Sequence, residues 1–232
     1  MTGLALSVVV PAYNESARLG PTLARIQAHL DARGGRSEVV VVDDGSRDDT
    51  ASLARAAGAR VVSHATNRGK GAAVRTGVAA AGGALVLICD ADLSTPIEEL
   101  DVLEAALVAG ADIAVGSRRL DARTIEVDQP LPRRVLGAAF RALVRLGLGV
   151  RVADPMCGFK LFTRTAAADL FTRARIDRWA YDVEVLRLAG DHWRVVEVPV
   201  RWRHVDGSRV SLGRDILTTA CELLEIRLVA QR

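Results

Sequence analysis

The sequence predicts an α/β fold in which helices flank a mainly parallel, Rossmann-like β-sheet. Along residues 1–119, short continuous apolar runs alternate with segments whose apolar residues recur every three or four positions. The first pattern is typical of strands buried on both faces, and the second of amphipathic helices. Such alternation produces right-handed crossovers between parallel strands. With 232 residues, half of them apolar, the chain is long enough to bury a sizeable core.

Five strands are expected in the first half, and each ends in polar residues. In chain order they are LALSVVVPA (4–12), EVVVVDDGS (38–46), ARVVSH (59–64), ALVLICDAD (84–92) and ADIAVGSR (111–118). The helices that accompany them are expected at 19–30, 48–57, 70–81 and from residue 96 onward. Ser46 and Asp49 are spaced like a capping box at the start of the second of these helices.

The pattern is less regular after residue 120. A loop is expected at 121–132, and residues 135–152 are apolar with periodic arginines. The remaining elements are expected to be a strand at 157–164, a helix at 179–190, a strand at 193–204 and a helix at 215–231. We therefore expect one domain over residues 1–232, whose second half (120–232) is mixed in character.

Charge and cysteine usage exclude several classes of protein. The net charge is only +3, which does not favour a nucleic-acid partner. Cys89, Cys157 and Cys221 lie far apart and show no metal-binding spacing, so reduced thiols are expected. The sequence shows no signal peptide and no charge-free window of about 18 residues that would span a membrane. A cytoplasmic location is expected.

Polar clusters follow four of the predicted strands. They are PAYNE (11–15), DDGS (43–46), DAD (90–92) and GSR (116–118). Ligands of open α/β sheets bind outside the carboxyl ends of the strands. Because all four clusters fall there, the sequence predicts one ligand site at this edge of the sheet.

Asp90 and Asp92 suggest a metal ion at this edge. Two carboxylates so close together repel each other unless a cation lies near them. A hard divalent ion accepts a few carboxylate oxygens and completes its shell with phosphate and water. The pair therefore predicts Mg²⁺ or Mn²⁺ bridging a diphosphate, and a solvated loop with a helix-capping acid is the alternative.

The stretch NRGKGAAVRTG adds cations next to glycines. Arg68, Lys70 and Arg75 match phosphate charge, and glycine lets the backbone approach a ligand. An exposed helix start is the alternative interpretation. No GxGxxG follows the first strand and no GxxxxGK[ST] occurs, which argues against Rossmann dinucleotide and P-loop sites.

Taken together, these motifs resemble a known family. VVVPAYNE, VVDDGSRDDT, NRGKGAAVRTG and DADLSTP are similar to the family 2 inverting glycosyltransferases, which have a GT-A fold. CGFKLFTRTAAADLF, RWAYDVEVL and VRWRHVDGSRV resemble the dolichyl-phosphate β-glucosyltransferase branch. Two departures are evident. The chain has Asp154-Pro155-Met156 where the branch usually has Asp-Thr-Gln, and the membrane-spanning helices common in relatives are missing.

The resemblance implies a role for each residue that matches a family motif. The residues it places along the nucleotide-sugar donor are Pro11, Tyr13, Glu15, Lys70, Asp90, Ala91 and Asp92. Asp43 or Asp44 is expected to contact the base, and the resemblance does not decide between them. Arg118 is expected to contact phosphate or the acceptor. Ser208 and Arg209 are expected to close over the diphosphate. A packed loop aromatic is the alternative for the tyrosine, and an exposed strand-end cation for Arg118.

The expected chemistry is inversion by in-line attack on the anomeric carbon. A hydroxyl acceptor needs a general base, whereas a phosphate monoester is largely anionic at pH 7 because its second pKa is about 6. The acidic catalytic candidates are Asp92, Asp154, Asp182 and Glu184. Positions 182 and 184 do not share a helix face, so one is expected to face the site and the other to support the structure. With a hydroxyl acceptor, Asp154, Asp182 or Glu184 becomes the base.

The function implied is transfer of a hexose, glucose from UDP-glucose, to a polyprenyl phosphate at the membrane surface. Residues 1–119 then form the donor half and 120–232 the acceptor half. Between residues 129 and 153 the chain has five arginines and no acid, which favours a helix in the headgroup plane and a peripheral position on the inner face of the membrane. An ordinary packing helix is the alternative there. The other functions considered are a soluble transferase with a hydroxyl acceptor, a GDP-mannose-dependent transferase, and a non-catalytic nucleotide-sugar-binding module.

Overall fold

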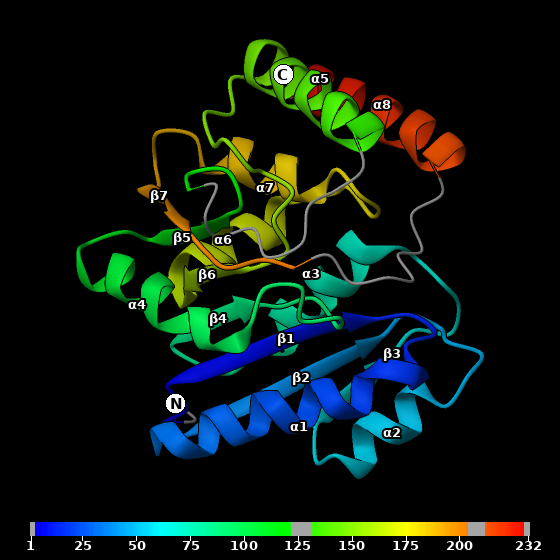
Figure 1. Cartoon of the computed structure of the whole chain (residues 1–232), viewed down its shortest axis with the longest axis vertical. Coiled ribbons are helices and arrows are strands. Elements are labelled where there is room, and N and C mark those ends of the chain that lie inside the picture. Colours follow the sequence, from blue (N-terminus) through cyan, green and yellow to red (C-terminus); the bar gives the residue numbers. More distant parts are fainter. Residues whose placement is uncertain (1–2, 122–130, 204–211, 230–232) are drawn as a thin grey trace.

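The computed structural model describes residues 3–121, 131–203 and 212–229. Strands and helices alternate along most of it (Figure 1). In chain order the elements are β1 (Leu6–Ala12), α1 (Ser16–Arg33), β2 (Ser37–Asp43), α2 (Thr50–Ala56), β3 (Arg60–Ser63), α3 (Lys70–Ala80), β4 (Leu85–Ile88), the 3₁₀-helix η1 (Ile97–Glu99), α4 (Leu100–Val108), β5 (Ile113–Ser117), α5 (Leu131–Leu148), β6 (Lys160–Thr163), α6 (Arg164–Arg173), α7 (Tyr181–Ala189), β7 (Val195–Pro199) and α8 (Leu212–Val229).

The described strands form one sheet in the order β3-β2-β1-β4-β6-β5-β7. Neighbouring strands are parallel except where β6 is involved, which runs antiparallel to both β4 and β5. The predicted mainly parallel α/β sheet is confirmed. The sequence pattern did not predict that β6, from the second half, lies between two strands of the first half. Because β6 runs backwards, it begins at the edge where β4 ends, and Lys160 pairs with Ile88.

Apolar residues on both faces of the sheet are buried, which is why the strands are continuous apolar runs. The buried apolar residues form two clusters. Consecutive residues of β1, such as Val8 and Val9, belong to different clusters. One cluster is completed by α1, η1 and α4, and the other by α3, α6 and α7. Figure 1 shows α5 and α8 side by side as an outer layer beyond α6 and α7. Val144 of α5 and Leu223 of α8 are buried in the second cluster.

Two local expectations differ from the structure. The capping box does not form, because α2 begins after Asp49 without a side-chain cap and the Ser46 hydroxyl accepts from Asn14 N instead. Residues 131 and 132, expected in a loop, begin α5, whereas 122–130 lie outside the described residues. Within the part of the chain that the structure describes, no helix is long and apolar enough to cross a membrane.

Candidate active site

Hydrogen bonds join the loops that follow β1 and β2. Asn14 N donates to Ser46 Oγ at 2.8 Å, and Arg47 N donates to Asn14 Oδ1 at 2.8 Å. Glu15 N donates to Thr50 Oγ1 at 2.7 Å. Asn14 has a φ of 52°, a left-handed conformation that asparagine adopts more readily than most residues. The PAYNE and DDGS clusters therefore form one continuous rim at the carboxyl edge of the sheet.

The side chains of the PAYNE cluster differ in exposure. Pro11 is buried within β1, and Tyr13 is half-buried at the rim. Glu15 is half-buried and forms an ion pair with Arg18 one turn along the chain. Tyr13 is therefore partly open to a ligand at the rim, whereas Glu15 is engaged by Arg18.

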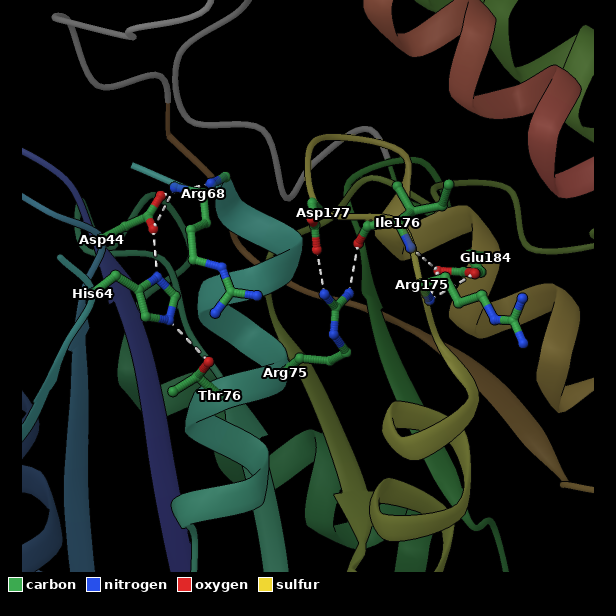
Figure 2. Close-up of polar contacts among 10 residues, drawn as sticks. Asp44, His64, Arg68, Arg75, Thr76, Arg175, Ile176, Asp177 and Glu184 are labelled. Atoms are coloured by element: carbon green, nitrogen blue, oxygen red, sulfur yellow. Dashed lines mark hydrogen bonds and ion pairs between the residues drawn. The ribbon is translucent and has the colours of Figure 1, made fainter. Parts of the chain in front are cut away.

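Asp43 and Asp44, adjacent in sequence, have different surroundings. Both Asp44 oxygens are occupied: Oδ1 by His64 Nδ1 at 2.6 Å and Arg68 N at 2.9 Å, and Oδ2 by Gly69 N at 2.8 Å (Figure 2). Asp43 Oδ1 accepts only the Ser46 N–H at 3.1 Å among the contacts within the described residues. Asp44 thus holds the loop that leads into α3, and Asp43 is the better placed of the two to meet a ligand.

His64 completes a short chain of polar contacts that the sequence reasoning missed. Its Nδ1 faces Asp44, and its Nε2 lies 2.9 Å from Thr76 Oγ1 on α3 (Figure 2). Gly69 caps α3 with a φ of 110°, which glycine adopts without strain. Asp44 and His64 therefore hold the amino end of α3, where Lys70 is the first residue. The only sequence signal for His64 is its place at the end of the third predicted strand.

Lys70 forms an ion pair with Asp90. Lys70 Nζ lies 2.6 Å from Asp90 Oδ1, and the rings of Trp179 and Tyr181 each lie 6.0 Å from it. Burial acts to lower the pKa of Lys70, but the charges of Asp90, Asp182 and Asp92 outweigh it and raise the pKa above its ordinary value. Lys70 is therefore a fixed positive charge beside the aspartate pair.

Asp90 and Asp92 follow β4 and are both half-buried. Asp92 Oδ1 accepts from Ser94 N at 2.9 Å, whereas the intervening Ala91 is buried and its carbonyl accepts from Thr22. Gly158 lies directly against Asp90, since a Cβ at Gly158 would come within 1.9 Å of Asp90 Oδ2. Because position 158 has no side chain, the Asp90 carboxylate can lie against the backbone there.

The donor set fits a hard divalent ion that relies on its substrate for part of its shell. No group of three or more His, Cys, Asp or Glu side chains suited to a metal occurs among the residues described. Two carboxylates on a short loop are sufficient for Mg²⁺ or Mn²⁺ when diphosphate oxygens and water supply the remaining ligands. The pair therefore suits an ion that arrives with a nucleotide better than one bound by the protein alone.

Arg118, at the end of β5, forms a bidentate ion pair with Asp154. Arg118 Nε and one terminal nitrogen lie 2.6 and 2.7 Å from the two carboxylate oxygens. Trp202 lies beneath the guanidinium at 5.3 Å. Burial acts to raise the pKa of Asp154, but Arg118 outweighs it and lowers the pKa. Both oxygens of Asp154 are engaged by Arg118, and this ion pair fixes the orientation of the guanidinium.

Asp182 and Glu184, in the first turn of α7, point to different surroundings. Asp182 is 3% exposed and accepts from the buried Lys160 ammonium at 2.5 Å. Burial raises the pKa of Asp182, although Lys160 and Lys70 act against it. Glu184 accepts from the backbone N–H groups of Arg175 and Ile176 (Figure 2). The structure thus brings Asp182 to the lysine and aspartate group, while Glu184 supports the loop before α7.

That loop, residues 174–180, packs on the amino end of α3. Arg75 donates to the Ile176 carbonyl at 2.9 Å and forms an ion pair with Asp177 (Figure 2). From the other side, Glu222 of α8 accepts from Ala180 N at 3.0 Å. The loop therefore places Trp179 beside Lys70. Ser208 and Arg209, expected to close over a diphosphate, lie outside the described residues.

Comparison with known proteins shows the family. The model of the glycosyl transferase family 2 matches residues 7–171. The chain belongs to glycosyl transferase family 2. The dolichyl-phosphate beta-glucosyltransferase of Drosophila melanogaster is 40% identical to this glycosyltransferase over 239 aligned positions, which cover 92% of this chain and 73% of the fly protein.

Solved structures show the same fold. Glucosyl-3-phosphoglycerate synthase from Mycobacterium tuberculosis, in complex with UDP, has a TM-score of 0.73 at 26% identity and covers 97% of this chain and 80% of its own. The same synthase in complex with Mn²⁺, UDP and glucosyl-3-phosphoglycerate has a TM-score of 0.71 at 25% identity, with coverage of 98% and 80%. The expected GT-A fold of this glycosyltransferase is confirmed.

A methyl group at position 158 is expected to displace the Asp90 carboxylate. Gly158→Ala should lower transfer by about 10²-fold, since a displacement of about 1 Å in a catalytic group has this effect. Transfer rates at saturating donor, with the melting temperature alongside, measure it. Gly20→Ala is the matched control, because a Cβ there, within α1, meets no atom within 4 Å. A wild-type transfer rate in Gly158→Ala would show that the contact between position 158 and Asp90 does not contribute to catalysis.

Proposed function

We propose that the chain transfers glucose with inversion from UDP-glucose to a polyprenyl phosphate of the dolichyl type. The observation that carries this proposal is that Asp154, Asp182 and Glu184, the acids considered as general bases, are each engaged by a cation or by backbone N–H groups. An acceptor hydroxyl would need a free base, whereas an acceptor phosphate does not. The similarity to dolichyl-phosphate glucosyltransferases along 92% of the chain supports the same acceptor.

The donor is assigned to the rim formed after β1, β2 and β4, within the donor half. Tyr13 borders the nucleotide, and Asp43, which accepts only the Ser46 N–H among the contacts of the described residues, contacts the base. Lys70 and Asp90 lie where a diphosphate would approach the amino end of α3, which itself favours anions. The related synthase that binds UDP supports a uridine nucleotide, and GDP is the alternative.

The divalent ion, Mg²⁺ or Mn²⁺, is assigned to Asp90 and Asp92. When bound, it offsets the negative charge that develops on the leaving diphosphate. Lys70 orients Asp90 through their ion pair and adds a second positive charge at the same place. A related synthase structure that contains Mn²⁺ supports the choice of a divalent ion.

The acceptor phosphate is assigned to the side of Arg118, which lies at the end of the donor half and contacts residues of the acceptor half. Asp154 and Trp202 fix the guanidinium from two directions, so that its orientation is set before a ligand arrives. A preoriented cation of this kind compensates phosphate charge at little entropic cost. The anionic oxygen of the acceptor is then the nucleophile, and the enzyme contributes position and charge.

We assign the layer of α5 and α8 to contact with the cytoplasmic (inner) face of the membrane. Large apolar side chains are exposed there, namely Leu143 (56%) and Leu146 (85%) on α5, and Leu224 (62%) and Leu228 (65%) on α8. We call these four residues the leucine ridge. Arg145 and Arg227 are exposed on the same helices. Exposed leucines flanked by arginines suit a headgroup region, where apolar chains insert and cations meet lipid phosphate.

A transfer assay with a panel of nucleotide sugars tests the function. We expect glucose transfer from UDP-glucose that requires both a short polyprenyl phosphate and Mg²⁺ or Mn²⁺, and that is lost in excess chelator. Asp92→Asn should abolish transfer without changing the melting temperature. Transfer from GDP-mannose alone would overturn the donor, and equal transfer to a glycan hydroxyl would overturn the acceptor. Full activity of Asp92→Asn would overturn the assignment of the metal to Asp90 and Asp92.

The pH dependence distinguishes a phosphate acceptor from an enzymatic base. The rate at subsaturating acceptor should fall as the pH decreases through about 6, because the acceptor then gains its second proton. A phosphonate acceptor with a higher second pKa should move this fall to higher pH. A profile that stays in place when the acceptor is changed would instead point to a titrating group of the enzyme.

Sedimentation with anionic liposomes tests the membrane surface. The double variant Leu146→Glu with Leu228→Glu should lose binding, because it places two charges where the leucine ridge enters the lipid. Val108→Glu is the matched control, since Val108 is 89% exposed on α4, which packs on the other face of the sheet. Equal liposome binding by wild type and the double variant would exclude the ridge as the contact surface.

A further inference from the structure

Lysine is nearly absent from this chain. Of its 31 lysine and arginine residues, only Lys70 and Lys160 are lysines. Lys70 pairs with Asp90 at the site, and Lys160 is 1% exposed on β6, between β4 and β5. An ammonium is a compact point charge, whereas a guanidinium is planar and wider. The compact cation is therefore used only at two enclosed positions, each beside an aspartate.

The ammonium of Lys160 has two partners inside the protein. It donates to the Cys157 carbonyl at 2.5 Å and to Asp182 at 2.5 Å. A charge buried this deeply is costly unless it is paired and hydrogen-bonded, and these two acceptors supply that compensation. The first contact bonds the lysine to a backbone carbonyl three residues earlier, at the start of the segment that enters β6.

Lys160 holds the segment of residues 154–158, which connects the side of Arg118 with the side of Asp90. Cys157 N donates to the Asp154 carbonyl at 3.3 Å, which closes a turn whose first side chain orients Arg118. The next residue after the turn is Gly158, whose backbone lies against the Asp90 carboxylate. Residues 154–158 therefore join the acceptor cation to the metal-binding acid, and Lys160 holds the end of this segment.

We propose that Lys160 is a positioning residue of the metal and donor site, acting through the Cys157 carbonyl to hold Gly158 against Asp90. The inference rests on the proposed function, because it assigns Asp90 to the metal. Loss of the ammonium removes the bond that fixes the carbonyl, so the Gly158 backbone and the carboxylate beside it lose their support. Substitution of a residue that orients a metal ligand without binding the metal typically changes metal affinity or activity by about 10–100-fold.

A pair of variants isolates this contact. Lys160→Met alone leaves Asp182 buried without its cation, which can prevent folding. The comparison is therefore between Asp182→Asn, which keeps the lysine and its bond to Cys157, and Lys160→Met combined with Asp182→Asn, which loses that bond. Two quantities are measured for each: the Mn²⁺ concentration giving half-maximal transfer, and Mn²⁺ affinity by calorimetry in the presence of UDP.

We expect the double variant to need about tenfold more Mn²⁺ than Asp182→Asn and to bind Mn²⁺ about tenfold more weakly. Ser7→Ala is the stability control. The Ser7 hydroxyl accepts from Gly82 N and Gly83 N near the amino ends of β1 and β4, so its loss should lower the melting temperature without changing the Mn²⁺ requirement. Equal Mn²⁺ affinities in the two variants would overturn the proposal. A wild-type protein without metal-dependent transfer would instead overturn the proposed function.

A measurement on the wild-type protein covers the case in which the double variant does not fold. Labelling with [¹³Cε]lysine gives two side-chain signals, which Lys70→Met assigns. We expect Mg²⁺ with UDP to shift the Lys160 signal in the wild type, and to shift it less in Gly158→Ala, where the contact with Asp90 is broken. A Lys160 signal that stays in place while Mg²⁺ and UDP bind the wild type would overturn the proposal.

Discussion

The site depends on the compensation of carboxylates that are gathered at one edge of the sheet. Asp90, Asp182 and Asp154 are each paired with a different cation: Lys70, Lys160 and Arg118. Carboxylates in a partly buried site repel one another, so each needs its own counter-charge before a divalent ion or a phosphate is added. The ion pairs also join three pairs of segments: α3 with the loop after β4, β6 with α7, and β5 with the turn before β6.

The sequence predicts those parts of the site that follow from strands ending at a common edge. The positions of Asp90, Asp92, Lys70 and Arg118 belong to this class, because each is set by its own strand or by the helix start next to it. By contrast, the sequence does not predict that β6 lies antiparallel between β4 and β5. A strand of four residues, three of them buried, has no feature that specifies its neighbours, which depend on contacts far apart in sequence.

The partners of the acids could not be predicted for the same reason. Spacing places positions 182 and 184 on different faces of a helix, but it does not reveal which one faces the site. That follows from Lys160, which lies on a different element, β6, and from the fold of the loop at 174–180, whose N–H groups donate to Glu184. Likewise, Asp43 and Asp44 are equivalent in sequence, and only the approach of His64 and Gly69 distinguishes them.

The place of β6 in the sheet also constrains the order in which the molecule can be assembled. The two strands that pair with β5, namely β6 and β7, both follow it in the chain, and β4 obtains its second neighbour only when β6 arrives. During synthesis, the first 119 residues therefore present β4 and β5 with open hydrogen-bonding edges, which other chains can pair with. A fragment that ends near residue 120 would expose both edges at once, and pairing with the edges of other chains would make it prone to aggregation.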